Sequence, residues 1–177
     1  MEQHHISVMI SEEEIEKRVC ELAAQISSDF AGETVKLICI LKGSAFFACE
    51  LAKRITVPVM IDFMQVSSYG SGTVSSGTVQ IKKDLDEPLK DENVIIVNKP
   101  SGILSQNTLS RLVPMLQERG PKDLRICTLL SKPERREVEI DVAYNGFEIP
   151  DKFVVGYGLD YDQHYRNLPY VGVIESE

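Results

Sequence analysis

The chain of 177 residues lacks any long apolar run and any excess of basic charge. Its clearest apolar runs, at 37–41 and 94–97, are only strand-sized, whereas a membrane-spanning helix needs about 20 apolar residues. Acidic residues number 27 against 19 basic ones, and the formal net charge of -8 disfavours nucleic acid and anionic lipid as partners. The first residues show neither the basic nor the apolar segment of a secretory signal. We therefore expect a cytoplasmic protein that binds neither membranes nor nucleic acid.

Metal-binding and redox motifs are also missing. The four cysteines have no Cys-x-x-Cys spacing, and the three histidines show no metal-ligand spacing. This pattern indicates neither a zinc site nor a redox pair, and we interpret the cysteines as reduced thiols that are buried as small apolar side chains. The cysteines are Cys20, Cys39, Cys49 and Cys127.

What the sequence does contain is an alternation of helical and strand patterns. A capping box at 11–14 predicts the start of a helix, and apolar residues at helical spacing continue it towards the glycine at 32. Further helices are predicted near 45–55 and 108–119. Strands are predicted near 35–41, 58–66, 79–82, 93–97, 124–130, 138–143 and 153–157. This order predicts one α/β domain over 1–177, with a mostly parallel sheet flanked by helices.

Ligands of such sheets bind beyond the carboxyl ends of the strands, so the loops at that edge are candidates for a site. Lys42-Gly43 could bring a cation and a close backbone approach to a phosphate, or could be a solvated start of a helix. The Gly/Ser-rich stretch 67–78 could be a mobile lid carrying Tyr69, or a plain surface loop. The polar run 105–108 could cap a helix, and the same atoms could bind an anion.

Three further segments leave similar alternatives open. Lys132 follows a predicted strand and could reach an oxygen atom in a pocket, or could belong to a solvated basic turn. Phe153 and Val154 are most simply explained as part of a core strand. Asp160 could hold a cation, although a surface carboxylate is the more usual case.

Four stretches carry a much more specific signal: LKGS at 41–44, SSYG at 67–70, GFEIPDKFVVGYGLDY at 146–161 and YRNL at 165–168. In these stretches the chain resembles the hypoxanthine (guanine) phosphoribosyltransferases. The resemblance implies the type I phosphoribosyltransferase fold, with a small hood built from the terminal segments, and homodimers or homotetramers. It also implies a pentosyltransferase of purine salvage. Such an enzyme uses Mg²⁺ and phosphoribosyl diphosphate to convert hypoxanthine or guanine to inosine or guanosine monophosphate (IMP or GMP), releasing diphosphate.

The same resemblance implies roles for individual residues on the diphosphate side. Lys42 and Gly43 would form the diphosphate-binding loop, with a non-proline cis peptide bond before Lys42. Ser68 and Tyr69 would belong to a lid that closes over the diphosphate. Arg166 would reach the departing diphosphate.

On the purine side the resemblance implies three contacts. Lys132 would contact the exocyclic purine oxygen, Phe153 would stack on the base, and Val154 would bind the purine edge through its backbone. Asp160 would help to hold Mg²⁺.

One motif departs from the family pattern. After a strand like that at 93–97 the family has Glu-Asp, two apolar residues and Asp-Thr-Gly, whereas this chain has NKPSGILSQN at 98–107, about two residues longer and without an acid. The resemblance implies that the acidic pair holds the ribose hydroxyls and assists the metal, and that a later Asp is the general base. Leu104 lies near that base position. Ser105 and Thr108 could still bind the 5'-phosphate. We therefore expect a transferase with a modified loop or, alternatively, a catalytically weak or inactive paralogue that binds purine or nucleotide in a regulatory role.

Overall fold

Two sheets organise the chain in the computed structural model, which describes residues 4–68, 79–99, 103–135 and 139–175. The larger sheet has six strands in the order β4-β3-β2-β5-β6-β7. Its neighbours from β3 to β7 pair in parallel, and β4 pairs antiparallel with β3 at one edge. The predicted, mostly parallel sheet is therefore confirmed. The strands are β2 (Val35–Ile40), β3 (Val59–Ser68), β4 (Val79–Lys83), β5 (Asn93–Asn98), β6 (Asp123–Ser131) and β7 (Tyr144–Glu148).

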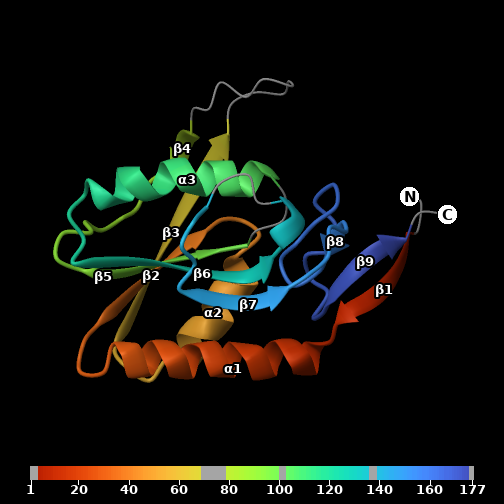
Figure 1. The fold of residues 1–177 in the computed structure, drawn as a ribbon, viewed down its shortest axis with the longest axis horizontal. Coiled ribbons are helices and arrows are strands. Elements are labelled where there is room, and N and C mark those ends of the chain that lie inside the picture. The colour runs from red at the N-terminus through yellow and green to blue at the C-terminus, as the bar shows by residue number, and fades with distance from the viewer. Residues whose placement is uncertain (1–3, 69–78, 100–102, 136–138, 176–177) are drawn as a thin grey trace.

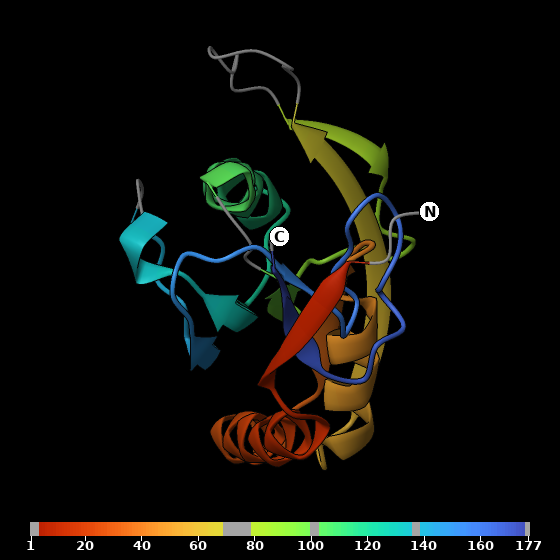
Figure 2. The ribbon, with the colours of Figure 1, turned by 90° about the vertical axis from the view of Figure 1, so that its right-hand side faces the viewer.

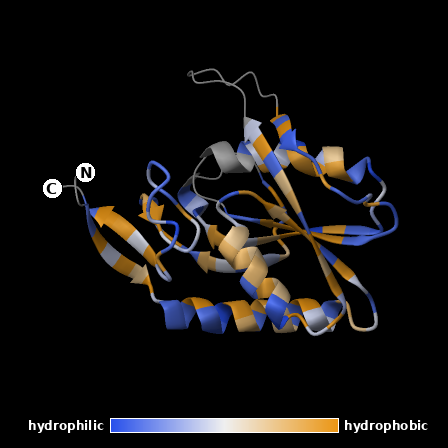
Figure 3. Ribbon diagram, turned by 180° about the vertical axis from the view of Figure 1, so that it is seen from behind, coloured by the Kyte–Doolittle hydropathy of each residue, from blue (hydrophilic) through white to orange (hydrophobic). Residues whose placement is uncertain are grey.

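Helices cover both faces of this sheet (Figure 1). Helices α1 (Glu12–Asp29) and α2 (Ala45–Arg54) pack on one face, and α3 (Ile103–Gln117) packs on the other. Within β2, Leu37 and Cys39 belong to the core on the α1/α2 side, while Ile38 and Ile40 belong to the core on the α3 side. Alternate side chains are thus buried on both faces, which explains why residues 37–40 of β2 form a continuous apolar run. Figure 3 shows these apolar strands between helices whose outer surfaces are more polar.

The terminal segments build the expected hood. Strands β1 (His5–Ile10), β9 (Val171–Glu175) and β8 (Val154–Val155) form a separate antiparallel sheet in the order β1-β9-β8. The two ends of the described chain lie together on this sheet, at one end of the molecule (Figures 1 and 2).

The capping box at the start of α1 is confirmed. The Ser11 hydroxyl accepts a hydrogen bond from the Glu14 backbone N–H at 3.1 Å, and the Glu14 carboxylate accepts one from the Ser11 N–H at 2.7 Å. This reciprocal pair satisfies two backbone donors that the first helical turn would otherwise leave unpaired.

Two element boundaries differ from the prediction. Helix α3 begins at Ile103 rather than near Thr108, so the second half of the expected 98–107 loop is helical. Among the residues of this helix whose side chains are described, the apolar contacts with the core start at Leu109, close to the predicted start of the helix. The strand predicted near 138–143 is found at Tyr144–Glu148 instead. Residues Ile140 and Val142 alternate like a strand and pack partly against the core, but pairing with β6 begins at Tyr144.

The expectation that the cysteines are buried is only half right. All are free thiols, but Cys20 and Cys49 are exposed, on α1 and α2 respectively. Cys39 and Cys127 lie in the core strands β2 and β6, and burial raises the pKa of the Cys39 thiol to about 12. Within the described part of the chain, no helix combines the length and apolar character needed to cross a membrane.

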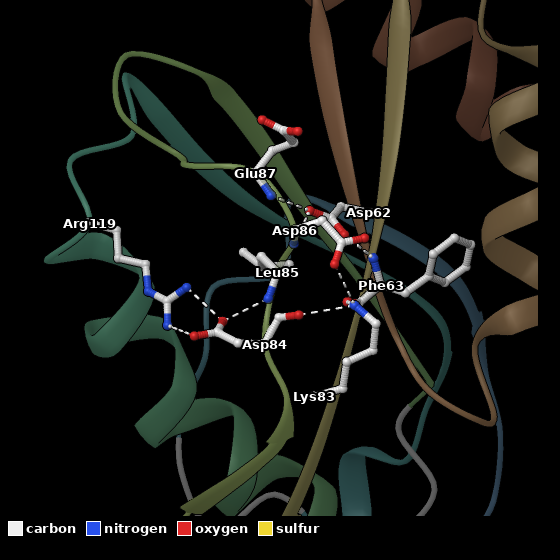
Figure 4. Close-up of polar contacts among 8 residues, drawn as sticks. All are labelled: Asp62, Phe63, Lys83, Asp84, Leu85, Asp86, Glu87 and Arg119. Atoms are coloured by element: carbon white, nitrogen blue, oxygen red, sulfur yellow. Dashed lines mark hydrogen bonds and ion pairs between the residues drawn. The ribbon is translucent and has the colours of Figure 1, made fainter.

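A buried carboxylate fixes the connection between β4 and β5 to the sheet (Figure 4). Asp62 of β3 accepts hydrogen bonds from the backbone N–H groups of Phe63, Asp86 and Glu87, at 2.8, 3.0 and 3.2 Å. In the same connection Asp84 forms a bidentate ion pair with Arg119, just beyond α3, at 2.7 and 2.9 Å. The guanidinium holds the pKa of the Asp84 carboxyl below its usual range. These bonds stabilise the scaffold.

Candidate active site

Three adjacent parallel strands are each followed by a lysine. Lys42 comes two residues after β2, Lys99 directly follows β5, and Lys132 directly follows β6. Because β2, β5 and β6 run in parallel, all three lysines lie beyond the same edge of the sheet, on the side of the hood. This is the edge at which sheets of this kind bind ligands.

The loop between β2 and α2 presents Lys42 and Gly43. The peptide bond between Leu41 and Lys42 is cis, as the resemblance implies. The Ser44 hydroxyl donates to the Ile40 carbonyl at 2.8 Å, and the Ala45 N–H donates to the Lys42 carbonyl at 3.1 Å. These bonds hold the loop close to the end of β2.

A second loop packs directly against the first. At Gly158, which has φ +95°, a Cβ atom would overlap the Gly43 carbonyl oxygen. Only glycine therefore allows the two backbones to approach this closely. The Gly158 N–H donates to the Arg166 carbonyl at 2.9 Å, so the first and last residues of the 158–166 segment are bonded to each other.

Three residues of the 158–166 segment contact one another: Asp160, Gln163 and Arg166. Arg166 donates to the Gly158 carbonyl at 2.7 Å and forms an ion pair with Asp160 at 3.1 Å. The Gln163 N–H donates to Asp160 at 3.0 Å, and the Gln163 side-chain oxygen accepts from both Lys42, at 3.2 Å, and Arg166, at 3.3 Å. Gln163 thus links two cations from distant parts of the chain. Sequence reasoning missed this residue, because no local pattern marks a glutamine with positive φ as a linker.

Lys99 was also missed, although it follows a strand just as Lys42 and Lys132 do. Its side chain lies along the Cα of Gly43: a Cβ there would overlap Cδ and Cε of Lys99 and lie 2.7 Å from its Nζ. Burial lowers the pKa of the Lys99 ammonium, the nearby Asp160 carboxylate opposes this shift, and the Arg166 guanidinium adds to it. The ammonium therefore lies inside the candidate diphosphate site.

Lys132 and Phe153 form a second group, beyond β6. Lys132 is buried, and its ammonium donates to the Lys152 carbonyl at 2.7 Å, so the solvated-turn alternative is wrong. Phe153 is 56% exposed and packs edge-on against Tyr161 with ring centroids 5.7 Å apart, so it is not a core residue. Val154 is buried in β8, opposite Val173 of β9.

The remaining candidate residues lie at the end of β3, in the stretch that follows it, and at the start of α3. Ser68 is the last residue of β3, and Tyr69, with the rest of the expected lid, lies outside the described residues. Leu104 and Ser105 are in the first turn of α3, and Thr108 is one turn further along it. The backbone N–H groups of that first turn lack partners within the helix, so its amino end suits an anion.

The donor set does not fit a Mg²⁺ ion held by the protein. Mg²⁺ requires several oxygen ligands, but Asp160 is already shared between Arg166 and the Gln163 N–H. Among the described residues no group of three or more His, Cys, Asp or Glu side chains could hold a metal ion.

Known proteins are similar to this chain in both sequence and architecture. The family model for the phosphoribosyl transferase domain matches residues 9–162. The hypoxanthine phosphoribosyltransferase of Salmonella typhimurium is 49% identical over 173 residues, covering 97% of this chain and 96% of that protein. The hypoxanthine-guanine phosphoribosyltransferase of Mycobacterium tuberculosis is 46% identical over 177 residues, covering 96% and 86%.

Solved structures agree with these relatives. A crystal structure of a hypoxanthine phosphoribosyltransferase from Staphylococcus aureus superposes with a TM-score of 0.90 at 45% identity, covering 96% of this chain and 91% of that one. A hypoxanthine-guanine phosphoribosyltransferase from Bacillus anthracis, with a HEPES molecule in its active site, gives 0.90 at 43% identity, covering 98% and 100%. The chain therefore belongs to the hypoxanthine phosphoribosyltransferase family.

Proposed function

We propose that the protein moves the phosphoribosyl group from phosphoribosyl diphosphate to hypoxanthine or guanine, giving IMP or GMP and diphosphate. The observation that carries the proposal is the pairing of two groups at one sheet edge. One is the cationic cluster of Lys42 and Arg166 joined by Gln163. The other is the buried Lys132, whose ammonium donates to the backbone carbonyl of the residue before the exposed Phe153. The first suits an anion, and the second suits a flat, oxygen-bearing base.

On the diphosphate side, the proposed chemistry is charge stabilisation. The bond from the ribose to diphosphate breaks while the sugar becomes cationic, so negative charge builds up on the leaving group. Lys42 and Arg166 would bind this charge, and the backbone of Gly43 would approach the phosphates closely. Ser68 and Tyr69 would close over them and exclude water.

On the purine side, the proposed contacts orient the base. The Phe153 ring would stack on the purine, and the Lys132 ammonium would donate to the exocyclic oxygen. Its hydrogen bond to the Lys152 carbonyl supports this role, because it fixes a flexible side chain at the edge of the site. The backbone of Val154 would bind the purine edge, and Ser105 and Thr108 would bind the 5'-phosphate at the start of α3.

The missing acids set the expected rate. With Leu104 near the family's base position, the purine proton must leave without a positioned carboxylate. Losing one general base typically costs about two to four orders of magnitude in rate. We therefore expect slow turnover. Members of this family generally use Mg²⁺, and here we propose that any Mg²⁺ is bound mainly by the substrate's phosphates. We also propose that the chain forms a single domain, assembles as a homodimer or homotetramer, and is located in the cytoplasm.

Replacing the divergent loop tests the proposal. In one variant, residues 98–107 are exchanged for the family's Glu-Asp, two apolar residues and Asp-Thr-Gly, and IMP formation from hypoxanthine is measured beside the unchanged chain. We expect measurable IMP from the unchanged chain and a rate gain of about 10²- to 10⁴-fold in the variant. If only the variant forms IMP, the unchanged chain is the inactive paralogue and the proposal is wrong. If neither chain forms IMP, the proposal is wrong as well.

A further inference from the structure

Lys99 stands where the resemblance requires an acid. It directly follows β5, the strand after which the family has its Glu-Asp pair, and β5 lies between β2 and β6 in the sheet. The family's acids would draw a divalent cation to this place, whereas Lys99 brings a positive charge of its own. The change therefore reverses the sign of the charge at this point of the site.

The Lys99 side chain is directed to the diphosphate loop by close packing. Its Cδ, Cε and Nζ atoms take up the space that a side chain at residue 43 would fill. Because Gly43 leaves that space open, the methylenes of Lys99 lie along its backbone, and the ammonium is held within the loop rather than in open solvent.

The charges around Lys99 favour an anion as its ligand. Lys42 and Arg166 add two cations, and Asp160, the acid of this cluster, is already paired with Arg166. Within residues 4–68, 79–99, 103–135 and 139–175 no hydrogen bond or ion pair of the Lys99 ammonium is found. A partly buried ammonium without such a partner costs free energy, and a bound anion would offset that cost.

We propose that Lys99 is a diphosphate-binding residue of this chain, whose ammonium supplies the charge that a carboxylate-held cation would otherwise supply. Diphosphate therefore binds to this protein without a divalent metal. The inference rests on the diphosphate side of the proposed function and does not depend on turnover.

Calorimetric titration with inorganic diphosphate in the presence of EDTA tests the proposal. The unchanged chain is compared with Lys99→Met, which keeps an unbranched side chain over Gly43, and with Lys99→Arg, which keeps the charge. Lys17→Met is the matched control, because Lys17 is exposed on α1. Thermal melts of all four proteins show whether each is folded.

We expect the unchanged chain to bind diphosphate without metal and Lys99→Met to bind it roughly 10- to 150-fold more weakly, the effect of losing a hydrogen bond from a charged group. Lys17→Met should bind like the unchanged chain, and Lys99→Arg should retain most of the affinity. The proposal is overturned if the unchanged chain binds only after Mg²⁺ is added, or if both methionine variants bind equally well. Since no purine is present, a failure of transfer activity leaves this result intact.

Discussion

Replacing Lys132 by methionine separates a purine-binding role from a structural one. The ammonium of this buried residue donates to the Lys152 carbonyl at 2.7 Å. Lys132→Met leaves that carbonyl without this donor, which costs about 1–3 kcal/mol of unfolding free energy. For a chain of this length, that corresponds to a fall in Tm of roughly 2–12 °C.

The kinetic effect should fall on one substrate. If the ammonium donates to the purine oxygen, its loss costs about 1.5–3 kcal/mol of binding, and the KM for hypoxanthine rises roughly 10- to 150-fold. The KM for phosphoribosyl diphosphate should change less than about threefold, because Lys42 and Arg166 are untouched. Steady-state assays with each substrate varied in turn measure both values.

A matched control lies twenty residues along the chain. Lys152→Met keeps the backbone carbonyl that accepts the bond and removes only an exposed side chain, so neither Tm nor the KM for hypoxanthine should change. If Lys132→Met lowers Tm but leaves the KM for hypoxanthine unchanged, Lys132 is structural and its proposed purine contact is refuted.

Substitutions at three further residues test the scaffold and the loop contact. Tyr144 donates to Asp29 at 2.6 Å, and burial and this bond raise the pKa of Tyr144 to about 12. Stability from this group is therefore complete below about pH 10, where the unfolded tyrosine titrates, and is lost as pH rises towards 12. Thermal melts between pH 9 and 11.5 should fall less steeply for Tyr144→Phe, and parallel curves would contradict this. Asp62→Ala, which removes the acceptor of three backbone N–H groups, should lower the unfolding free energy by about 2–4 kcal/mol in urea. Asp62→Asn keeps one acceptor oxygen and should lose less unfolding free energy, so equal losses in the two variants would contradict the role of Asp62 as an acceptor. Gly158→Ala would overlap the Gly43 carbonyl at a strained φ, and it should raise the KM for phosphoribosyl diphosphate at least tenfold; a normal KM would show that this approach is unimportant.

The fold was largely predictable because its signals are local. The capping box at Ser11 and the apolar residues 37–40 of β2 each depend on neighbours in the sequence, and both are confirmed as helix start and buried strand. The boundaries that were wrong depend on distant partners. Residues 139–142 alternate like a strand, but whether they form one depends on the register with β6, which begins at Tyr144.

The site was less predictable than the fold, because its contacts join residues that are distant in the sequence. The positions of Lys42, Lys132 and Arg166 could be proposed from the resemblance, and the structure brings Lys42 and Arg166 together through Gln163. Lys99 had the same signal as the other lysines, a cation directly after a parallel strand. Its direction, however, depends on Gly43 in another loop, and no pattern within the sequence encodes that contact.

The most direct test of the proposed function is the product balance of the unchanged chain. Purified protein is incubated with hypoxanthine, phosphoribosyl diphosphate and Mg²⁺, and IMP and diphosphate are quantified together by chromatography against a protein-free sample. We predict that the two products form in equal amounts and in proportion to the protein concentration. No IMP above the protein-free sample, or diphosphate released without IMP, would contradict purine phosphoribosyl transfer by this chain.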